Sequence, residues 1–397
     1  MKSLSIFVHS ASECLTDYES HGDGLICFSL LNGLAQRNHN IFAYTRYPVI
    51  SQEYPNLQVK VGGRHRVPFD SLQDWEHSWK ADNWLQNLSH KHDIDIVWRM
   101  HPYGTSSPTM PKTLGRPLVV GPLFLSCPEN KAMKSKPRFG IGIEKFVSPF
   151  AQQGWHRTLQ AASLIICATT KQAESIQNQY PQAKVLCLPV IVDPPFSDLS
   201  STRRIPDKSR PFHLLFVANL LPNKNPLIFC QAVKILRDQG MNVKATLLGD
   251  GPERSKIEAY CASEKLEDFI YLQGKIPHHE VYKYLHSADL LISSSLFEAY
   301  GRSIVEAMSV GTPCICSYDS GGPAEIIEND VDSILVKELT AKAFADAIAR
   351  IYSNPQIWQY LSENAIAKAK TWRSEVVLVR LEDSLIEISQ TKKIIWR

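Results

Sequence analysis

Short apolar runs alternate with longer amphipathic segments along the first half of the chain. Runs of this length that are almost entirely apolar are typical of strands buried on both faces of a parallel sheet, and apolar residues spaced by three and four predict helices. This alternation predicts a doubly wound α/β domain. The predicted strands are Leu4–Val8, Ile41–Tyr44, Ile94–Trp98, Pro117–Val120 and Leu164–Ala168, with a helix over Leu25–Arg37.

The same pattern begins again after a polar stretch between residues 189 and 211 that several prolines interrupt. Such a stretch is typical of a linker between domains. We therefore predict a first domain over residues 1–195, a linker over 196–211 and a second Rossmann-like domain over 212–373. The strands predicted for the second domain are Phe212–Val217, Val243–Leu248, Ile270–Gln273, Leu290–Ser294 and Pro313–Ser317, and the helices between them are Leu227–Asp238, Glu280–His286 and Ser303–Ser309.

Beyond Leu335 the pattern becomes helical. Apolar residues recur at spacings of three and four over Ala341–Ser353, Pro355–Thr371 and Ser374–Ser389. The last of these segments is long enough to pack back against the first domain. We therefore predict that residues 374–397 form a helix that returns toward the N-terminal domain.

Composition and charge exclude several classes of protein. At about 150 residues per domain, 397 residues predict two large or three small domains, and 44% hydrophobic and 21% charged residues are typical of a globular chain. A net charge of +3 is too small for a dedicated nucleic-acid binder, so we expect no nucleic-acid partner. No run of 18 apolar residues predicts a membrane-spanning helix, and the apolar stretch near the N-terminus is too short for a signal peptide. The nine cysteines form no CxxC motif, which indicates free thiols in a cytoplasmic protein.

The segment Ser293–Met308 carries the most chemistry. A strand ends there, a loop with Gly301 follows, and a helix begins, which is where doubly wound sheets bind ligands. Glu298 lies in the loop, and Glu306 lies about one turn into the helix among apolar neighbours. A carboxylate in such surroundings needs strong hydrogen-bond donors, and a pair of sugar hydroxyls supplies them. Alternatively, Arg302 and Glu306 form an ordinary surface pair at helical spacing.

The order of motifs in the second half resembles a known family. Glu298 and Glu306, with seven residues between them, are followed by Gly311-Thr312-Pro313 and by Ser320–Ile327. This arrangement resembles the E-x7-E signature of family 4 glycosyltransferases, over nearly all of residues 212–372 and more loosely over the first half, through Leu34–His39. The resemblance implies a GT-B fold, in which two Rossmann-like domains face a cleft, the acceptor domain comes first, and the final helix crosses back to it.

The resemblance also assigns roles around the donor. Glu306 would hold the ribose hydroxyls of the donor nucleotide, and Glu298 would contact hydroxyls of the donor sugar. Backbone amides near Ala299, Tyr300 and Gly301 would hold the sugar and the diphosphate, which explains a glycine where the chain must approach closely.

A second group of residues would surround the diphosphate and the base. Lys224 matches the family lysine that stabilises the leaving diphosphate, although a solvated loop lysine is the plain alternative. The family usually has an arginine where this chain has Asn219, and Arg302 is a candidate substitute. Two loops resemble those that line the nucleotide pocket, although each alone reads as a turn: Gly249-Asp250-Gly251-Pro252 and Gln273-Gly274-Lys275-Ile276.

The first half offers weaker candidates. Gly22, Asp23 and Gly24 precede a helix whose amide end would meet the donor phosphates or the acceptor, or they simply form a tight turn. His101 follows a predicted strand and is either an acceptor-side base or hydroxyl contact, or a polar loop histidine. Many relatives place a histidine after the following strand, where this chain has Val119-Val120-Gly121-Pro122.

Two further patterns bear on metals and membranes. Asp93-Ile94-Asp95 resembles the DxD metal site of other sugar transferases, but it precedes an apolar strand, so we read it as strand entry and expect neither metal nor cofactor. Lys131, Lys134, Lys136 and Arg138 are followed by apolar residues up to residue 150. This segment is either a solvated loop or a contact with an anionic membrane. A membrane contact would place the protein on the inner face of the membrane with a lipid-linked acceptor.

The expected function is retaining transfer of a hexose from a UDP- or GDP-linked sugar to an acceptor hydroxyl, in cell-envelope glycan or natural-product glycoside synthesis. In this metal-independent reaction, as the resemblance implies, the leaving phosphate takes the acceptor proton. Two alternatives remain. One is a GT-B enzyme of different chemistry, such as a sugar-nucleotide epimerase or a sucrose-type synthase. The other is a non-catalytic relative that only binds a sugar nucleotide, for which Asn219 is the main argument.

Overall fold

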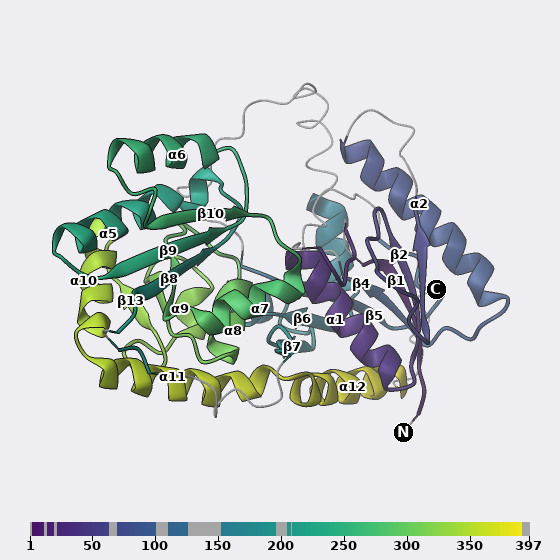
Figure 1. Ribbon diagram of the computed structural model, residues 1–397. Coiled ribbons are helices and arrows are strands. Elements are labelled where there is room, and N and C mark those ends of the chain that lie inside the picture. The colour runs from purple at the N-terminus through teal and green to yellow at the C-terminus, as the bar shows by residue number, and fades with distance from the viewer. Residues whose placement is uncertain are drawn as a thin grey trace. The chain divides into compact units, whose positions relative to one another are not determined.

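The fold is taken from a computed structural model of the chain (Figure 1), which describes residues 2–11, 14–19, 22–62, 70–100, 110–125, 152–195, 205–207 and 209–390. These residues divide into two compact units. The N-terminal unit holds the described residues up to Phe124, those from 152 to Ile191, and those from Ser374 onward. The C-terminal unit holds Val192–Arg373 and Leu125. The last helix therefore belongs to the N-terminal unit.

The N-terminal unit is built on a parallel sheet of seven strands in the order β3-β2-β1-β4-β5-β6-β7. The central strands are buried along their whole length, as their apolar sequences predict. The strands are β1 (Ser5–Ser10), β2 (Asn40–Thr45), β3 (Leu57–Val61), β4 (Ile96–Arg99), β5 (Leu118–Leu123), β6 (Leu164–Cys167) and β7 (Val185–Cys187). The helices are α1 (Gly22–Gln36), α2 (Asp70–Ser89), residues 152–160, α4 (Thr170–Gln179) and α12 (Ser374–Gln390).

Helix α12 packs against α1 through a close contact at Gly33. A Cβ atom on Gly33 would lie 2.5 Å from Leu378 Cδ1, so any larger residue at this position would require the Leu378 side chain to move. Glu382, also on α12, is buried and binds two residues that follow α1. Arg37 Nε donates to its Oε2 at 2.6 Å, and His39 Nε2 lies 3.0 Å from its Oε1. Because His39 Nδ1 accepts the Leu4 amide at 3.0 Å, Nε2 carries the proton and donates to Glu382.

The C-terminal unit is built on a parallel sheet of six strands in the order β10-β9-β8-β11-β12-β13. The strands are β8 (Phe212–Val217), β9 (Val243–Leu248), β10 (Ile270–Gly274), β11 (Leu290–Ser293), β12 (Cys314–Ser317) and β13 (Ile334–Val336). The helices are α5 (Pro226–Asp238), α6 (Arg254–Ser263), α7 (His278–Ser287), α8 (Arg302–Ser309), α9 (Pro323–Ile326), α10 (Ala341–Tyr352) and α11 (Pro355–Ala369), with short 3₁₀ turns at Pro222–Lys224 and Lys370–Trp372.

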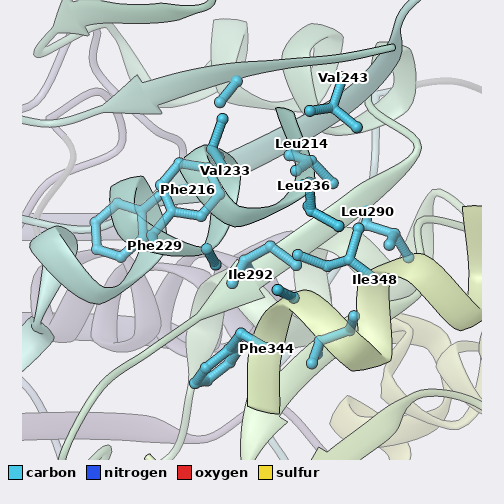
Figure 2. Packing of buried hydrophobic residues seen from close by; sticks show 14 of the residues in the cluster. Leu214, Phe216, Phe229, Val233, Leu236, Val243, Leu290, Ile292, Phe344 and Ile348 are labelled. Carbon is cyan, nitrogen blue, oxygen red and sulfur yellow. The ribbon is translucent and has the colours of Figure 1, made fainter. Parts of the chain in front are cut away.

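One apolar core supports this sheet. Leu214 and Phe216 of β8, Phe229 of α5 and Phe344 of α10 all belong to this core. Figure 2 shows Phe216 beside Phe229, and the two rings stack with their centroids 5.7 Å apart. Aliphatic residues of β11 and α10, such as Ile348, extend the same core. Helices α5 and α10 thus pack against the sheet through this core, and the loops that carry polar side chains leave from the ends of its strands.

The predicted fold class is confirmed, and the predicted strands and helices agree with the structure to within a few residues. The pattern missed the strands β3, β7 and β13, which are short or lie at sheet edges. In β3, Leu57 is buried and the other residues are at least partly exposed. Because this edge strand buries so little, its sequence contains no continuous apolar run. Helix α2 was also missed because its apolar residues are widely spaced among polar ones.

Candidate active site

The carboxyl ends of β8 and β9 lead into two loops that lie directly against each other. Gly249 adopts φ +133°, and a Cβ there would lie 2.0 Å from the Ala218 carbonyl oxygen. Gly251 is equally restricted, because a Cβ would lie 2.5 Å from the Leu220 carbonyl oxygen. The Leu220 amide donates to the Asp250 carbonyl at 3.0 Å and locks the two loops together. The predicted pocket glycines therefore have a steric reason: the main chains of the two loops touch.

The loop between β11 and α8 is fixed in the same way. Glu298 forms a two-bond bridge with the β12–α9 loop, since its amide donates to the Ser320 carbonyl at 2.7 Å and its carbonyl accepts from the Gly322 amide at 2.8 Å. A Cβ on Gly322 would lie 2.4 Å from the Tyr300 carbonyl oxygen. Gly301 then adopts φ +103° at the start of α8. The backbone around Glu298 is thus held before any ligand arrives.

Lys224 and Glu298 form an ion pair at this edge of the sheet. The Lys224 Nζ atom lies 2.6 Å from Glu298 Oε1, and the two side chains are 19% and 18% exposed. Ser295 Oγ donates to the same oxygen at 2.7 Å. Ser294 Oγ donates to the Asn225 carbonyl at 2.9 Å and holds the loop that carries Lys224. The lysine is therefore a positioned, partly buried cation and not a freely solvated one.

Glu306 is buried and is held by Arg302 and His278. Arg302 Nε donates to Glu306 Oε1 at 2.6 Å, and His278 Nε2 lies 2.7 Å from the same oxygen. Burial alone raises the pKa of Glu306, but the charges of Arg302 and His278 and their hydrogen bonds outweigh it and lower the pKa to about 2. Among the described residues, Glu306 Oε2 accepts no hydrogen bond and the buried Arg302 Nη1 donates none. Arg302 and Glu306 do form the ion pair that their helical spacing allows. The pair is buried and not on the surface, and each partner keeps an atom available for a further hydrogen bond.

His278 is the residue that the sequence did not reveal. It begins α7 just beyond β10, and its ring meets that of Tyr282 edge-on at 5.6 Å, which orients the imidazole toward Glu306. Burial and the neighbouring Glu306 raise the pKa of Tyr282, so this phenol stays neutral. The only sequence signal was position, since His278 lies three residues after Lys275. Both Lys275 and Asn219 are exposed and lie just beyond the carboxyl ends of β10 and β8.

Comparison with known proteins gives this geometry a context. Residues 200–368 match the family model described as glycosyl transferases group 1. A 2-deoxystreptamine N-acetyl-D-glucosaminyltransferase from Niallia circulans is 24% identical over 311 residues, covering 74% of this chain and 78% of that protein. The structure of sucrose-phosphate synthase from Thermosynechococcus elongatus superposes with a TM-score of 0.73 at 18% identity, covering 99% of this chain and all of that one.

A second solved structure, HepE from Anabaena in complex with UDP and glucose, matches with a TM-score of 0.64 at 17% identity, over 97% of this chain and all of that one. The chain is a glycosyltransferase with the GT-B fold. In this glycosyltransferase the predicted residues Lys224 and Glu298 meet in one ion pair, and Glu306 with Arg302 forms a second cluster. Both clusters lie at the carboxyl edge of the C-terminal sheet, around the loop that joins β11 to α8.

The candidates in the N-terminal unit are less well supported. Gly22 begins α1 in open space, whereas Gly24 is required because a Cβ would lie 1.9 Å from the Cys14 carbonyl oxygen. Asp23 is half-buried in the first turn of α1. His101 lies outside the described residues, and so does the basic and apolar segment 131–150. Their predicted roles stay predictions.

The remaining polar features do not add to the site. Asp93 pairs with Arg116, and Asp95 accepts the Ser5 amide at 2.9 Å, both at the amino end of β4 and far along the strand from its carboxyl end. Within the described ranges, no three His, Cys, Asp or Glu side chains gather as a metal site, and no helix is long and apolar enough to cross a membrane. A cavity of about 680 Å³ lies beside the first residues of β2 and β3. These residues are at the amino ends of the strands, opposite the carboxyl ends where ligands of such sheets bind.

Proposed function

We propose that this glycosyltransferase moves a hexose from a nucleoside diphosphate sugar to an acceptor hydroxyl with retention at the anomeric carbon. The observation that carries the proposal is the state of Glu306: it is ionised, buried, anchored through Oε1 and open at Oε2. A carboxylate oxygen of this kind accepts the two hydroxyls of a ribose, which offset its desolvation. The comparisons support it, since a GT-B structure of similar fold was solved with UDP and glucose.

The second cluster suits the departure of the diphosphate. When the bond between the anomeric carbon and the phosphate oxygen breaks, negative charge develops on that oxygen, and a fixed ammonium stabilises it. We propose that Lys224 supplies this charge, because its amine is already held at 2.6 Å from Glu298. Glu298 then serves twice: it positions the lysine, and its remaining oxygen accepts hydroxyls of the donor sugar. This charge compensation needs no metal ion.

The transfer itself needs no protein nucleophile. The acceptor oxygen attacks the anomeric carbon on the face from which the diphosphate leaves, and the acceptor proton passes to the leaving phosphate oxygen. One carbon–oxygen bond breaks and one forms on the same face, so configuration is retained. Because a related protein is named for action on 2-deoxystreptamine, aminoglycoside-like natural products are proposed acceptors beside cell-envelope glycans.

A thermal-shift screen of UDP- and GDP-linked hexoses tests the proposal. A donor at 100 times its Kd stabilises a protein by about 2.7 kcal/mol, a shift of several degrees. We expect such a shift with one donor, loss of the shift in Glu306→Gln, and a nearly normal shift in Lys224→Ala. Lys224→Ala should instead lose about 100-fold or more in the rate of nucleoside diphosphate release with acceptor present.

Matched controls separate site effects from general instability. Glu363→Gln and Lys342→Ala alter exposed helix residues of the same unit and should change neither donor binding nor rate. Release of free sugar without any acceptor product would favour an enzyme of different chemistry. If a donor shifts the wild type, but neither acceptor product nor free sugar forms and Lys224→Ala behaves like Lys342→Ala, the protein is a non-catalytic relative that only binds a sugar nucleotide.

A further inference from the structure

Two tryptophans on α2 of the N-terminal unit are exposed to solvent. Trp75 is 47% exposed and Trp79 is 64% exposed, although tryptophan side chains usually bury a large area in a folded protein. Trp84, on the same helix, shows the usual behaviour, with 7% exposed within the core. At a spacing of four residues, Trp75 and Trp79 lie on neighbouring turns of one helix face. Neither is used by the chemistry described above.

The stripe of α2 continues with two amide side chains, the partly buried Asn83 and the exposed Gln86, and these four residues carry no charge. Asn83 and Gln86 follow Trp75 and Trp79 at spacings of four and three, so the four side chains lie along one line of the helix. The charged residues that flank the line are already paired: Lys80 Nζ lies 2.7 Å from Glu76 Oε1, and Arg46 pairs with Asp74. The stripe is therefore aromatic and amide-bearing, and these two flanking ion pairs, both among the described residues, carry no net charge.

The stripe begins at the functional edge of the N-terminal sheet. Arg46 directly follows β2, and its ion pair with Asp74 fixes the first turns of α2 beside the carboxyl end of that strand. The ring of His77 packs at 4.8 Å on Tyr44, near the same end of β2. Ligands of doubly wound sheets bind beyond the carboxyl ends of the strands, so a long acceptor bound there can extend along α2.

We propose that Trp75 and Trp79 form a platform for the uncharged sugar residues of an acceptor glycan. These sugar residues lie outside the one to which the new sugar is transferred. The C–H face of a pyranose ring packs on the electron-rich face of an indole, as a cation does, while its hydroxyls hydrogen-bond to amides such as Asn83 and Gln86. Four residues at a rise of about 1.5 Å each separate the two tryptophans by about 6 Å along the helix axis. This inference rests on the proposed function, because it assigns the acceptor a glycan chain.

The charge and size of the patch argue against the other occupants. An anionic membrane is attracted by unpaired Lys and Arg at about 1 kcal/mol each, whereas Lys80 and Arg46, the cations beside this stripe in the described part of the chain, are paired. A stable interface with a second copy buries about 1,200 Å² or more, with an apolar centre, and two indoles among amides are too small for that. A neutral, hydroxyl-rich chain matches both properties.

Calorimetric titration with cellohexaose, maltohexaose and chitohexaose tests the platform, with glucose as the short control. We expect at least one hexamer to bind wild type and glucose to bind far more weakly. Trp75→Ala with Trp79→Ala should weaken hexamer binding about tenfold or more, and the double phenylalanine variant should retain most of it. Tyr360→Ala, which removes an exposed aromatic ring from α11 of the C-terminal unit, should leave hexamer binding unchanged.

Donor binding separates the two proposals. If a donor sugar nucleotide binds the double alanine variant as it binds wild type while the hexamer is lost, the platform stands. If the donor binds but no hexamer does, or if the alanine variant binds hexamers normally, the platform is overturned and the proposed function survives. Tryptophan-dependent sedimentation with phosphatidylglycerol vesicles, or a tryptophan-dependent dimer in size-exclusion chromatography, also overturns it in favour of a membrane or a second copy. Failure of every donor to bind instead defeats the proposed function.

Discussion

Each unit of the protein contains a buried glutamate held by one arginine and one histidine, and the two differ in a way that separates structure from function. Glu382 uses both oxygens: Arg37 binds Oε2, and His39 binds Oε1. At Glu306, Arg302 and His278 both bind Oε1. Similar residues thus make a closed cluster in the N-terminal unit and an open one in the C-terminal unit.

The histidines show the same difference. His39 is used on both ring nitrogens, because Nδ1 accepts the Leu4 amide while Nε2 binds Glu382. His278 binds Glu306 through Nε2 and meets Tyr282 through its ring. A closed cluster has no capacity left for a ligand, so Glu382 only fastens α12 to the unit. An open cluster retains an acceptor oxygen at Glu306 and a donor nitrogen at Arg302, and these are what a ligand can bind.

The largest expected effect concerns acid stability and Glu306. Its pKa is lowered from 4.5 to about 2 in the fold, so its contribution to stability is fully present above about pH 4.5 and is lost as the pH falls toward 2. A shift of this size corresponds to about 3 kcal/mol. We expect the gap in Tm between wild type and Glu306→Gln to be widest near pH 6 and to narrow as the pH falls from 5 to 3. A gap that stays constant over this range would contradict the ionised, anchored carboxylate.

A smaller effect is expected at the closed cluster. Glu382→Gln replaces charge-assisted hydrogen bonds to Arg37 and His39 by neutral ones and should cost about 2 kcal/mol of unfolding free energy, measured by urea denaturation. Donor affinity should stay within about twofold of wild type, because the residues of the donor cluster lie in the other unit. Glu387→Gln on the same helix, which alters an exposed pair with Lys184, is the matched control and should cost little. A loss of donor affinity in Glu382→Gln would show that the Glu382 cluster also contributes to donor binding, which would contradict its purely structural role.

The smallest effect is expected for His278→Asn. Asparagine keeps a donor but loses the imidazole that packs on Tyr282, so Glu306 is held less firmly and donor affinity should fall about fivefold. The neighbouring His279 is 61% exposed, and His279→Asn should leave the donor Kd unchanged. Isothermal titration with the donor identified by the thermal screen measures both. Equal Kd values for the two variants would show that His278 has no part in positioning Glu306.

Much of the fold and part of the site could be predicted from the sequence. Buried parallel strands such as Phe212–Val217 are apolar along their length, so they stand out. Glu298 and Glu306 stood out because they lie in the loop and helix that follow such a strand, whereas Lys224 was found through the resemblance of its loop to that of a known family. Edge strands such as Leu57–Val61 escaped because only one residue is buried.

The partner of Glu306 escaped for another reason. His278 lies 28 residues before Glu306, and only the pairing of strands brings the start of α7 beside α8. Nothing in the local sequence distinguishes His278 from the adjacent His279, although the His278 side chain is 15% exposed and lies against a carboxylate while that of His279 is 61% exposed. Long-range pairing of this kind is a property of the assembled sheet and not of any segment.

The placement of α12 in the N-terminal unit has a consequence for the order in which the protein is made. When residues 1–373 have been synthesised, both sheets are complete. Gly33, Arg37 and His39 still lack their partners, because those partners lie on α12. The apolar face that α12 covers, through residues such as Leu381 and Leu385, stays open until residues 374–390 have been synthesised. The first unit to emerge is therefore the last to be finished, and the C-terminal unit can reach its native packing before it.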